Sequence, residues 1–178
     1  MPFAANKNFF ELFGLSAAFD IDLTDLTQRY RGLARELHPD RYASGSGQER
    51  RLALQMTALL NQAHQTLKDP IARAAYLLQL RGVELGNDTD TKMDPEFLAD
   101  QIELRERLDD ARHDSNPRAR YEELATIVER RLQETTDKLR TRLAPDAAHA
   151  EQARDIVREL QFLDRIRRQI VEMVEELA

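Results

Sequence analysis

Three consecutive residues in the first quarter of the chain, His38-Pro39-Asp40, combine side chains suited to a polar contact. Asp40 is an acceptor-only anion, and His38 donates or accepts hydrogen bonds near neutral pH. Pro39 lacks an N–H and disfavours helical backbone at the residue before it, so a helix must end at or just before His38. We therefore expect the three side chains on an exposed turn that docks onto a cationic surface. A helix stop followed by a polar loop would contain the same tripeptide.

A second group of candidate residues lies on one face of the helix predicted for residues 95–113. At about 100° per residue, this face begins with the apolar residues Leu98, Ala99 and Ile102. It continues with a cluster of carboxylates, namely Glu103, Glu106, Asp109 and Asp110. Phe162, in the last predicted helix, also lies off the apolar stripe of its neighbours. Such a patch commonly marks a partner surface.

Two other interpretations of this face remain open. Leu98 and Ile102 could pack against the first domain instead of a partner. Glu103, Glu106 and Asp110 could serve a metal-dependent helical hydrolase, although no histidine, cysteine or nucleophile accompanies them. We assign His64, His113 and His149 structural roles, because none has the spacing of a metal ligand. No cofactor and no metal site are expected.

The composition favours a folded, helix-rich protein that positions these residues. Of the 178 residues 42% are apolar and 33% are charged, and there are 6 Gly, 6 Pro and no Cys. The missing cysteines exclude disulfides and thiolate metal sites. The net charge of −6 is uneven, with 9 basic against 8 acidic residues in 1–80 and 17 against 24 in 81–178. We therefore expect no nucleic acid and no membrane as partners, and a cytoplasmic location.

The first half predicts an antiparallel helical hairpin with short flanking helices. After a short aromatic segment at 8–15, apolar stripes predict helices from 22–25 to 37 and from 49 to 67. The first stripe is Leu26, Tyr30, Leu33 and Leu37, and the second is Leu52, Met56, Leu59, Ala63 and Thr66 or Leu67. Residues 42–48 between them have the composition of a loop. A further helix is predicted from Pro70, a favoured first helical residue, to about Arg81-Gly82. Gln28, Arg29, Arg31 and Arg35 form a basic solvent face beside the first stripe.

The second half predicts a three-helix bundle over residues 95–178, after a polar linker at 83–94. Its helices are expected at 95–113, from Asn116-Pro117 to about Leu143, and from about Asp146 to Glu176. Each has an apolar stripe that only the other two can bury. On the first of these helices the buried stripe comprises Phe97, Leu104, Leu108 and Ala111.

The motif around the tripeptide resembles a J-domain, the co-chaperone module of DnaK-type ATPase chaperones. The resemblance covers residues 8–80 and rests on Phe9-Phe10-Glu11-Leu12-Phe13-Gly14-Leu15, on Tyr30 to Leu37, on Asn61-Gln62-Ala63-His64 and on Asp69-Pro70 to Leu78. It implies a chaperone-binding site at His38, Pro39, Asp40, Gln28, Arg29, Arg31, Arg35 and Arg41.

The order of the two halves is similar to that of the HscB-type co-chaperones of iron-sulfur cluster assembly. The hallmarks are His38 to Gly45, Asn61-Gln62-Ala63, the Phe97-Leu98 to Arg105-Glu106 helix and Phe162-Leu163-Asp164. The resemblance implies an HscA-like ATPase chaperone and an IscU-type iron-sulfur scaffold protein as partners. It places the scaffold-binding positions at Leu98, Ala99, Ile102, Glu103, Glu106, Asp110 and Phe162. Ala99 and Asp110 depart from the methionine and glutamate familiar in the family.

These expectations describe an all-α, two-domain, non-enzymatic co-chaperone, with a J-domain at 1–82 and a scaffold-binding bundle at 95–178. One domain would bind the scaffold and the other the ATPase, so tethering raises the local concentration of client at the chaperone. A general J-protein for unfolded clients and a carboxylate-based metal hydrolase are the alternatives.

Overall fold

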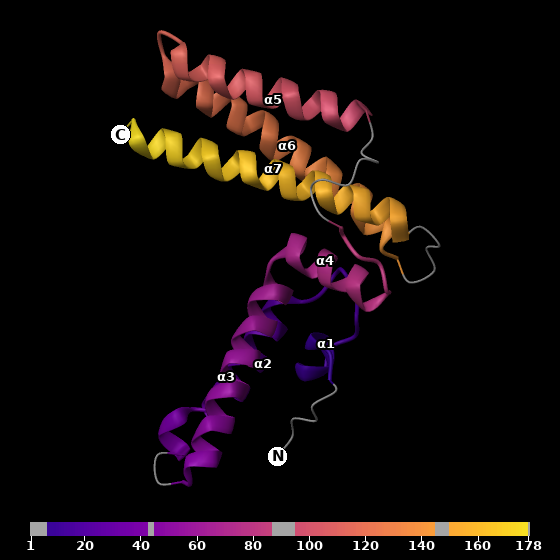
Figure 1. Ribbon diagram of the computed structural model, residues 1–178, viewed down its shortest axis with the longest axis vertical. Helices are drawn as coiled ribbons and strands as arrows, with labels where there is room; N and C mark the ends of the chain where they lie inside the picture. Colours follow the sequence, from indigo (N-terminus) through magenta and orange to yellow (C-terminus); the bar gives the residue numbers. More distant parts are fainter. Residues whose placement is uncertain (1–6, 43–44, 87–94, 145–149, 178) are drawn as a thin grey trace. The chain divides into compact units, whose positions relative to one another are not determined.

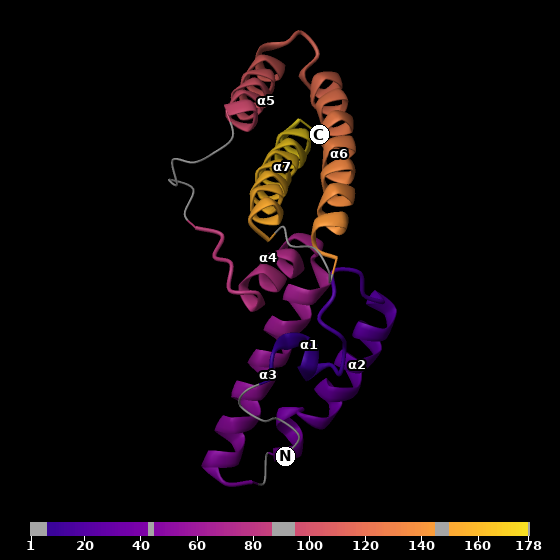
Figure 2. The same cartoon turned by 90° about the vertical axis from the view of Figure 1, so that its right-hand side faces the viewer.

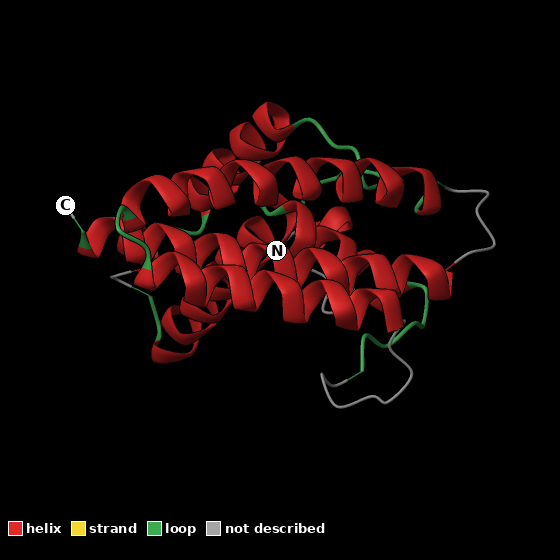
Figure 3. Ribbon diagram, turned by 90° about the horizontal axis from the view of Figure 1, so that it is seen from above, coloured by secondary structure: helices red, strands yellow, loops and turns green. Residues whose placement is uncertain are grey.

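The computed structural model describes residues 7–42, 45–86, 95–144 and 150–177. Within these ranges every regular element is helical, which confirms the all-α prediction (Figures 1 and 3). The elements are α1 (Phe9–Leu12), α2 (Leu23–Glu36), a 3₁₀ turn η1 (Pro39–Tyr42), α3 (Gly47–Lys68), α4 (Pro70–Leu80), α5 (Pro95–His113), α6 (Pro117–Arg142) and α7 (Ala150–Glu176).

The chain divides into two compact units, Met1–Leu77 and Leu78–Ala178, so the division falls inside α4. α4 ends as the sequence predicts: Gly82 has a φ of +76°, and the N–H of Val83 donates to the carbonyl of Leu78. The domain limits of 82 and 95 stay a prediction. Most of the linker expected at 83–94, residues 87–94, lies outside the described residues.

In the first unit, α2 begins and ends where its sequence predicts. The Asp22 carboxylate accepts hydrogen bonds from the N–H groups of Thr24 (2.8 Å) and Asp25 (3.1 Å), which caps the helix. Leu37 is the C-terminal cap, and the chain then forms the 3₁₀ turn η1. The turn expected around Pro39 is therefore confirmed.

The start of α3 differs from the prediction of a loop that lasts through Gln48. Ser46 and Glu49 form a capping box, in which each side chain accepts a hydrogen bond from the other residue's backbone N–H, so the helix begins at Gly47. The two glycines and two serines of this segment suggested a loop, but the capping pair outweighs them.

The apolar stripe predicted for α3 is wrong at Leu59, which is 37% exposed. The buried face carries the predicted Ala63 and Leu67, together with Ala53, Leu60 and His64. Leu59 and Leu60 are adjacent and both fit a helical spacing, so the pattern alone could not separate them. In α4 the sequence pattern favours a buried stripe of Ile71, Ala75 and Leu78, and Leu78 is buried as expected. Ala74 and Leu77 are buried as well, whereas Ile71 and Ala75 are only half-buried.

A stack of rings joins α2 to α3 in the first unit. The rings of Tyr30 and His64 lie 4.1 Å apart and nearly parallel, and the Tyr30 hydroxyl donates to Oδ1 of Asn61 at 3.0 Å. His64 is 8% exposed, and its Nε2 has no hydrogen-bonding partner within the described part of the chain. The sequence-based assignment of His64 to a structural role is consistent with this packing.

The second unit contains the predicted three-helix bundle, in which α5, α6 and α7 pack against one another (Figure 2). Pro117 opens α6 behind the cap residue Asn116, as predicted. The core joins the stripes of all three helices: Leu104, Leu108, Ala111, Tyr121, Leu124, Val128, Phe162, Leu163, Ile166 and Ile170. Asp146, expected at the start of the last helix, lies outside the described residues.

We expect the buried His64 to make the stability of the first unit depend on pH. Burial, helped by the positive charge of Lys68, lowers the pKa of His64 below its ordinary value of about 6.5. The unfolded chain therefore takes up a proton that the folded chain resists. We expect the free energy of unfolding to hold its full value above about pH 6.5 and to fall as the pH drops below it. His64→Phe keeps a stacked ring without a titratable group. The free energy of unfolding of this variant, measured with urea, should therefore lack the decrease at low pH that His64 causes. An identical pH profile for the two proteins would contradict the assignment.

Candidate partner-binding surfaces

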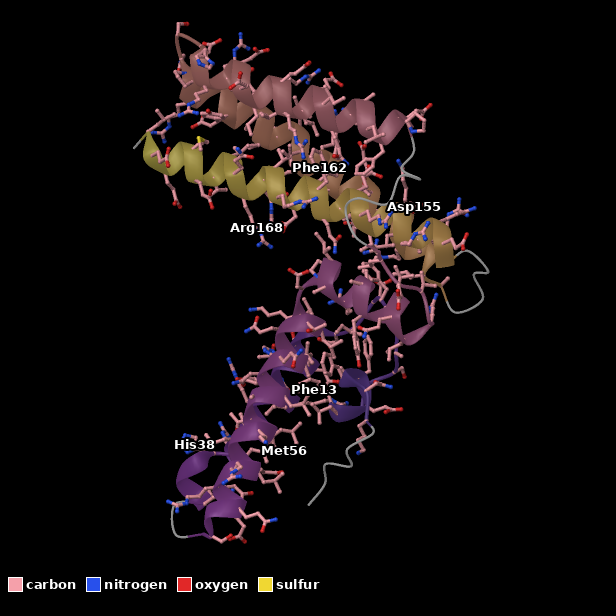
Figure 4. The ribbon with its side chains drawn as sticks, in the orientation of Figure 1. Phe13, His38, Met56, Asp155, Phe162 and Arg168 are labelled. Carbon is pink, nitrogen blue, oxygen red and sulfur yellow. The ribbon has the colours of Figure 1, made fainter. Side chains whose placement is uncertain are left out.

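The turn that carries His38 lies at one end of the α2–α3 hairpin (Figure 4). The Thr57 hydroxyl lies 2.9 Å from the carbonyl oxygen of Ala53 and 3.3 Å from that of Leu37, so α3 holds the end of α2. The N–H of Arg41 donates to the carbonyl of His38 at 3.0 Å, which closes the turn. His38 is exposed on this braced turn.

The basic residues predicted beside the turn do not all behave alike. Gln28, Arg31, Arg35 and Arg41 are exposed. The Arg29 guanidinium instead binds the Asp25 carboxylate at 2.9 Å and donates to the carbonyls of Phe13 (2.9 Å) and Gly14 (3.0 Å). The hydrogen bond to Asp25 raises the pKa of Arg29. Arg29 therefore holds the end of α1 on α2, a contact for which the sequence contains no signal.

Pro39 and Asp40 belong to η1 by their backbone, and their side chains are not described. Their predicted part in chaperone binding therefore stays a prediction.

The outer face of α5 carries the second set of predicted residues. Leu98 is 41% exposed and Ile102 is 57% exposed, and Ala99, Glu106 and Asp110 are also exposed. Glu103 is half-exposed and accepts a hydrogen bond from Arg107 at 2.5 Å. These residues share one face because α5 buries Leu104, Leu108 and Ala111 on the opposite side. The patch that the sequence predicted is thus present as a continuous face.

Phe162 does not lie on that exposed face, so the prediction that it lies off the bundle core is wrong. Its side chain is 3% exposed and belongs to the core of the second unit. Its ring meets the ring of Phe97 edge-on at 6.0 Å, and Cζ of Arg105 lies 5.7 Å from its centroid. Figure 4 places Phe162 between α5 and α7. The ring was misassigned because α7 buries a broader surface than one stripe, facing α5 as well as α6.

The turn between α5 and α6 is fixed by ion pairs beside Asp110. Asp114 accepts hydrogen bonds from the backbone N–H of Asn116 and from Arg120 at 3.0 Å, and these two partners lower the pKa of Asp114. Arg120 also binds Glu123 at 2.9 Å. A cavity of about 370 Å³ lies next to this turn and is lined by Arg107, Asp110, Ala111, Asp114, Arg120, Glu123, Leu124 and Ile127.

Two negative findings apply to the described residues alone. No group of three or more His, Asp or Glu side chains is placed there to hold a metal ion. No described helix is both long and apolar enough to span a membrane.

Two family models match the chain: a DnaJ domain at residues 8–76, and the HscB C-terminal oligomerisation domain at residues 93–171. A co-chaperone HscB homolog of Shewanella baltica is 41% identical over 171 residues, which cover 96% of this chain and 98% of the relative. The chain belongs to the HscB family of co-chaperones.

Solved structures of the family support this membership. The chaperone HscB of Vibrio cholerae matches with a TM-score of 0.85 and 35% identity, over 97% of this chain and 100% of that one. The crystal structure of the human co-chaperone HscB matches with a TM-score of 0.88 and 30% identity, over 96% and 83%. The two family models and the co-chaperone relative confirm the J-domain, the C-terminal domain and the co-chaperone role expected from the sequence. The HscB family acts in iron-sulfur cluster assembly.

The burial of Phe162 predicts a stability effect that exposed residues of α5 do not share. Phe162→Ala removes a ring from the core, and we expect it to lower the free energy of unfolding of the second unit by about 3 to 5 kcal/mol. Leu98→Ala should change that free energy by less than about 1 kcal/mol, because its side chain is partly in water. Urea unfolding of the full chain, followed by circular dichroism, measures both. Equal losses in the two variants would contradict the assignment of Phe162 to the core.

Proposed function

We propose that this HscB-family chain stimulates the ATPase of a DnaK-type, HscA-like chaperone and delivers an IscU-type iron-sulfur scaffold protein to it. The observation that supports this most is the presence of two exposed surfaces in two separate compact units of one chain. The chain itself performs no chemistry in this proposal, and the partner chaperone hydrolyses ATP. We place this activity in the bacterial cytoplasm.

The chaperone-binding surface is the α2–α3 turn with the exposed side of α2. His38 provides a hydrogen-bonding group on a turn that Thr57 braces from α3. Arg31 and Arg35, one helical turn apart and both exposed, add positive charge beside it. Charges on such a rim act mainly on the association rate and are screened within about 8 Å at physiological salt. We therefore assign the specific contact to the turn and the guidance of encounter to the arginines.

The scaffold-binding surface is the outer face of α5. Leu98, Ala99 and Ile102 provide an apolar centre, and Glu103, Glu106 and Asp110 provide an acidic rim. Interface energy concentrates in a few desolvated apolar groups, so Leu98 and Ile102 are the energetic anchors. Phe162 supports this face from beneath, through Phe97 and Arg105. The small size of the apolar centre favours one defined client over the unfolded chains bound by a general J-protein.

The variant His38→Gln tests whether the turn that carries His38 binds the chaperone. We expect the variant to lose most of the stimulation of ATP turnover, because His38 makes the proposed contact with the chaperone. The variant should keep its fold, because His38 is exposed and lies outside the core. Steady-state ATPase assays with the partner chaperone measure the loss. Its circular dichroism spectrum and its affinity for the scaffold should equal those of the wild type. Near-normal stimulation by a folded His38→Gln protein would refute the role of the turn.

The outer face of α5 is tested by Ile102→Ala, with Val171→Ala as the matched control. Ile102 is 57% exposed and Val171, on α7, is 51% exposed, so both truncations remove a comparably exposed apolar side chain. We expect Ile102→Ala to weaken scaffold binding by about 1 to 3 kcal/mol and Val171→Ala to leave it unchanged. Calorimetric titration of the scaffold measures both affinities. Equal affinities of the two variants would mean that the client binds elsewhere.

A further inference from the structure

The outer face of α5 is bordered by opposite charges on its two edges. At about 100° per residue, Leu98 and Ile102 mark the middle of the face. The carboxylates of Glu103, Glu106 and Asp110 lie to one side of this line, and Arg105 and Arg112 lie to the other. The exposed Asp109 lies on the line itself, two turns beyond Ile102 and one turn beyond Arg105. These charged residues are all at least partly exposed. The face is therefore not uniformly acidic, although the second half of the chain is acidic overall.

Arg105 is held in place at its edge by the core beneath it. Cζ of Arg105 lies 5.7 Å from the centroid of the Phe162 ring, within the range of a cation–π contact. Phe162 is itself fixed, because it is 3% exposed and meets Phe97 edge-on at 6.0 Å. A guanidinium that lies over a fixed ring loses little conformational freedom when it then binds a partner.

Two further arginines lie near Phe162 along α7. Arg158 precedes Phe162 by four residues and Arg165 follows it by three, so both flank the ring on the same side of the helix. Arg165 is exposed, and Arg158 donates from Nε to the carbonyl of Leu85 at 2.7 Å. Arg105 therefore contacts the Phe162 ring, and Arg158 and Arg165 lie one turn to either side of Phe162 along α7.

We infer that this surface recognises a client segment of matching polarity: an apolar centre, basic side chains along one edge and acidic side chains along the other. The inference rests on the proposed scaffold-binding role of α5. Two edges of opposite charge allow one orientation of such a segment and penalise the reverse one, because reversal places like charges together. The arginine edge therefore sets the direction in which the client lies across α5, and the leucine–isoleucine centre supplies affinity.

Reversing the charge of Arg105 tests this inference through the direction in which scaffold affinity changes. Arg105→Glu places a carboxylate against the acidic edge of the client, so we expect scaffold affinity to fall by about tenfold. A client that is basic throughout would instead bind Arg105→Glu more tightly than wild type. Arg130→Glu is the matched control, because Arg130 is likewise an exposed arginine but lies on α6 and not on the outer face of α5. Its affinity should stay within about threefold of wild type.

A second variant separates charge from packing. Arg105→Met keeps a long side chain over the Phe162 ring without the charge, so it should retain the unfolding midpoint of wild type and lose about threefold in affinity. Calorimetric titration of the scaffold into each full-length variant gives the affinities. Unchanged or tighter binding by Arg105→Glu, with normal binding by wild type, overturns the charge-edge inference alone. Absence of binding by wild type overturns the proposed function, and the inference with it.

Discussion

The packing of α5 on α6 and α7 determines which residues of this helix can meet a partner. α5 buries Leu104, Leu108 and Ala111, and their area removed from water is the main favourable term that fixes its rotation about its own axis. Once that face is turned inward, Leu98, Ile102 and Glu106 must face outward on the same helix. A rotation by one residue would bury carboxylates and expose the core, so the exposed face of α5 is as firmly specified as the core itself.

The first unit depends on a comparable constraint at its turn. Proline restricts the backbone of the turn, but it does not fix the end of α2 relative to α3. Here the Thr57 hydroxyl binds the end of α2, and the Tyr30–Asn61 hydrogen bond joins the same two helices further along. The exposed His38 is therefore presented on a braced end of the hairpin, and under the proposed function it would lose little conformational entropy on binding the chaperone.

Sequence reasoning predicted this fold well where a local rule applies and less well where two distant segments meet. Pro117 and its capping residue Asn116 predicted the start of α6, and the motif around His38 predicted the turn. The sequence could not decide whether Leu59 or Leu60 faces the core, because both residues fit a helical spacing. The burial of Phe162 depends on Phe97, 65 residues earlier in the chain, and the tie between Arg29 and Phe13 crosses between two helices. No single-helix pattern contains such contacts.

The central claim is that one chain must hold both partners at once, and mixing two defective full-length variants tests it most directly. His38→Gln is expected to keep the scaffold surface, and Leu98→Ala with Ile102→Ala is expected to keep the chaperone surface. ATP turnover by the chaperone is measured in the presence of scaffold, with each variant alone and with both together. We expect the mixture to give no more stimulation than the two variants give separately in sum, because tethering within one chain supplies the effective concentration. Recovery of wild-type stimulation by the mixture would contradict it.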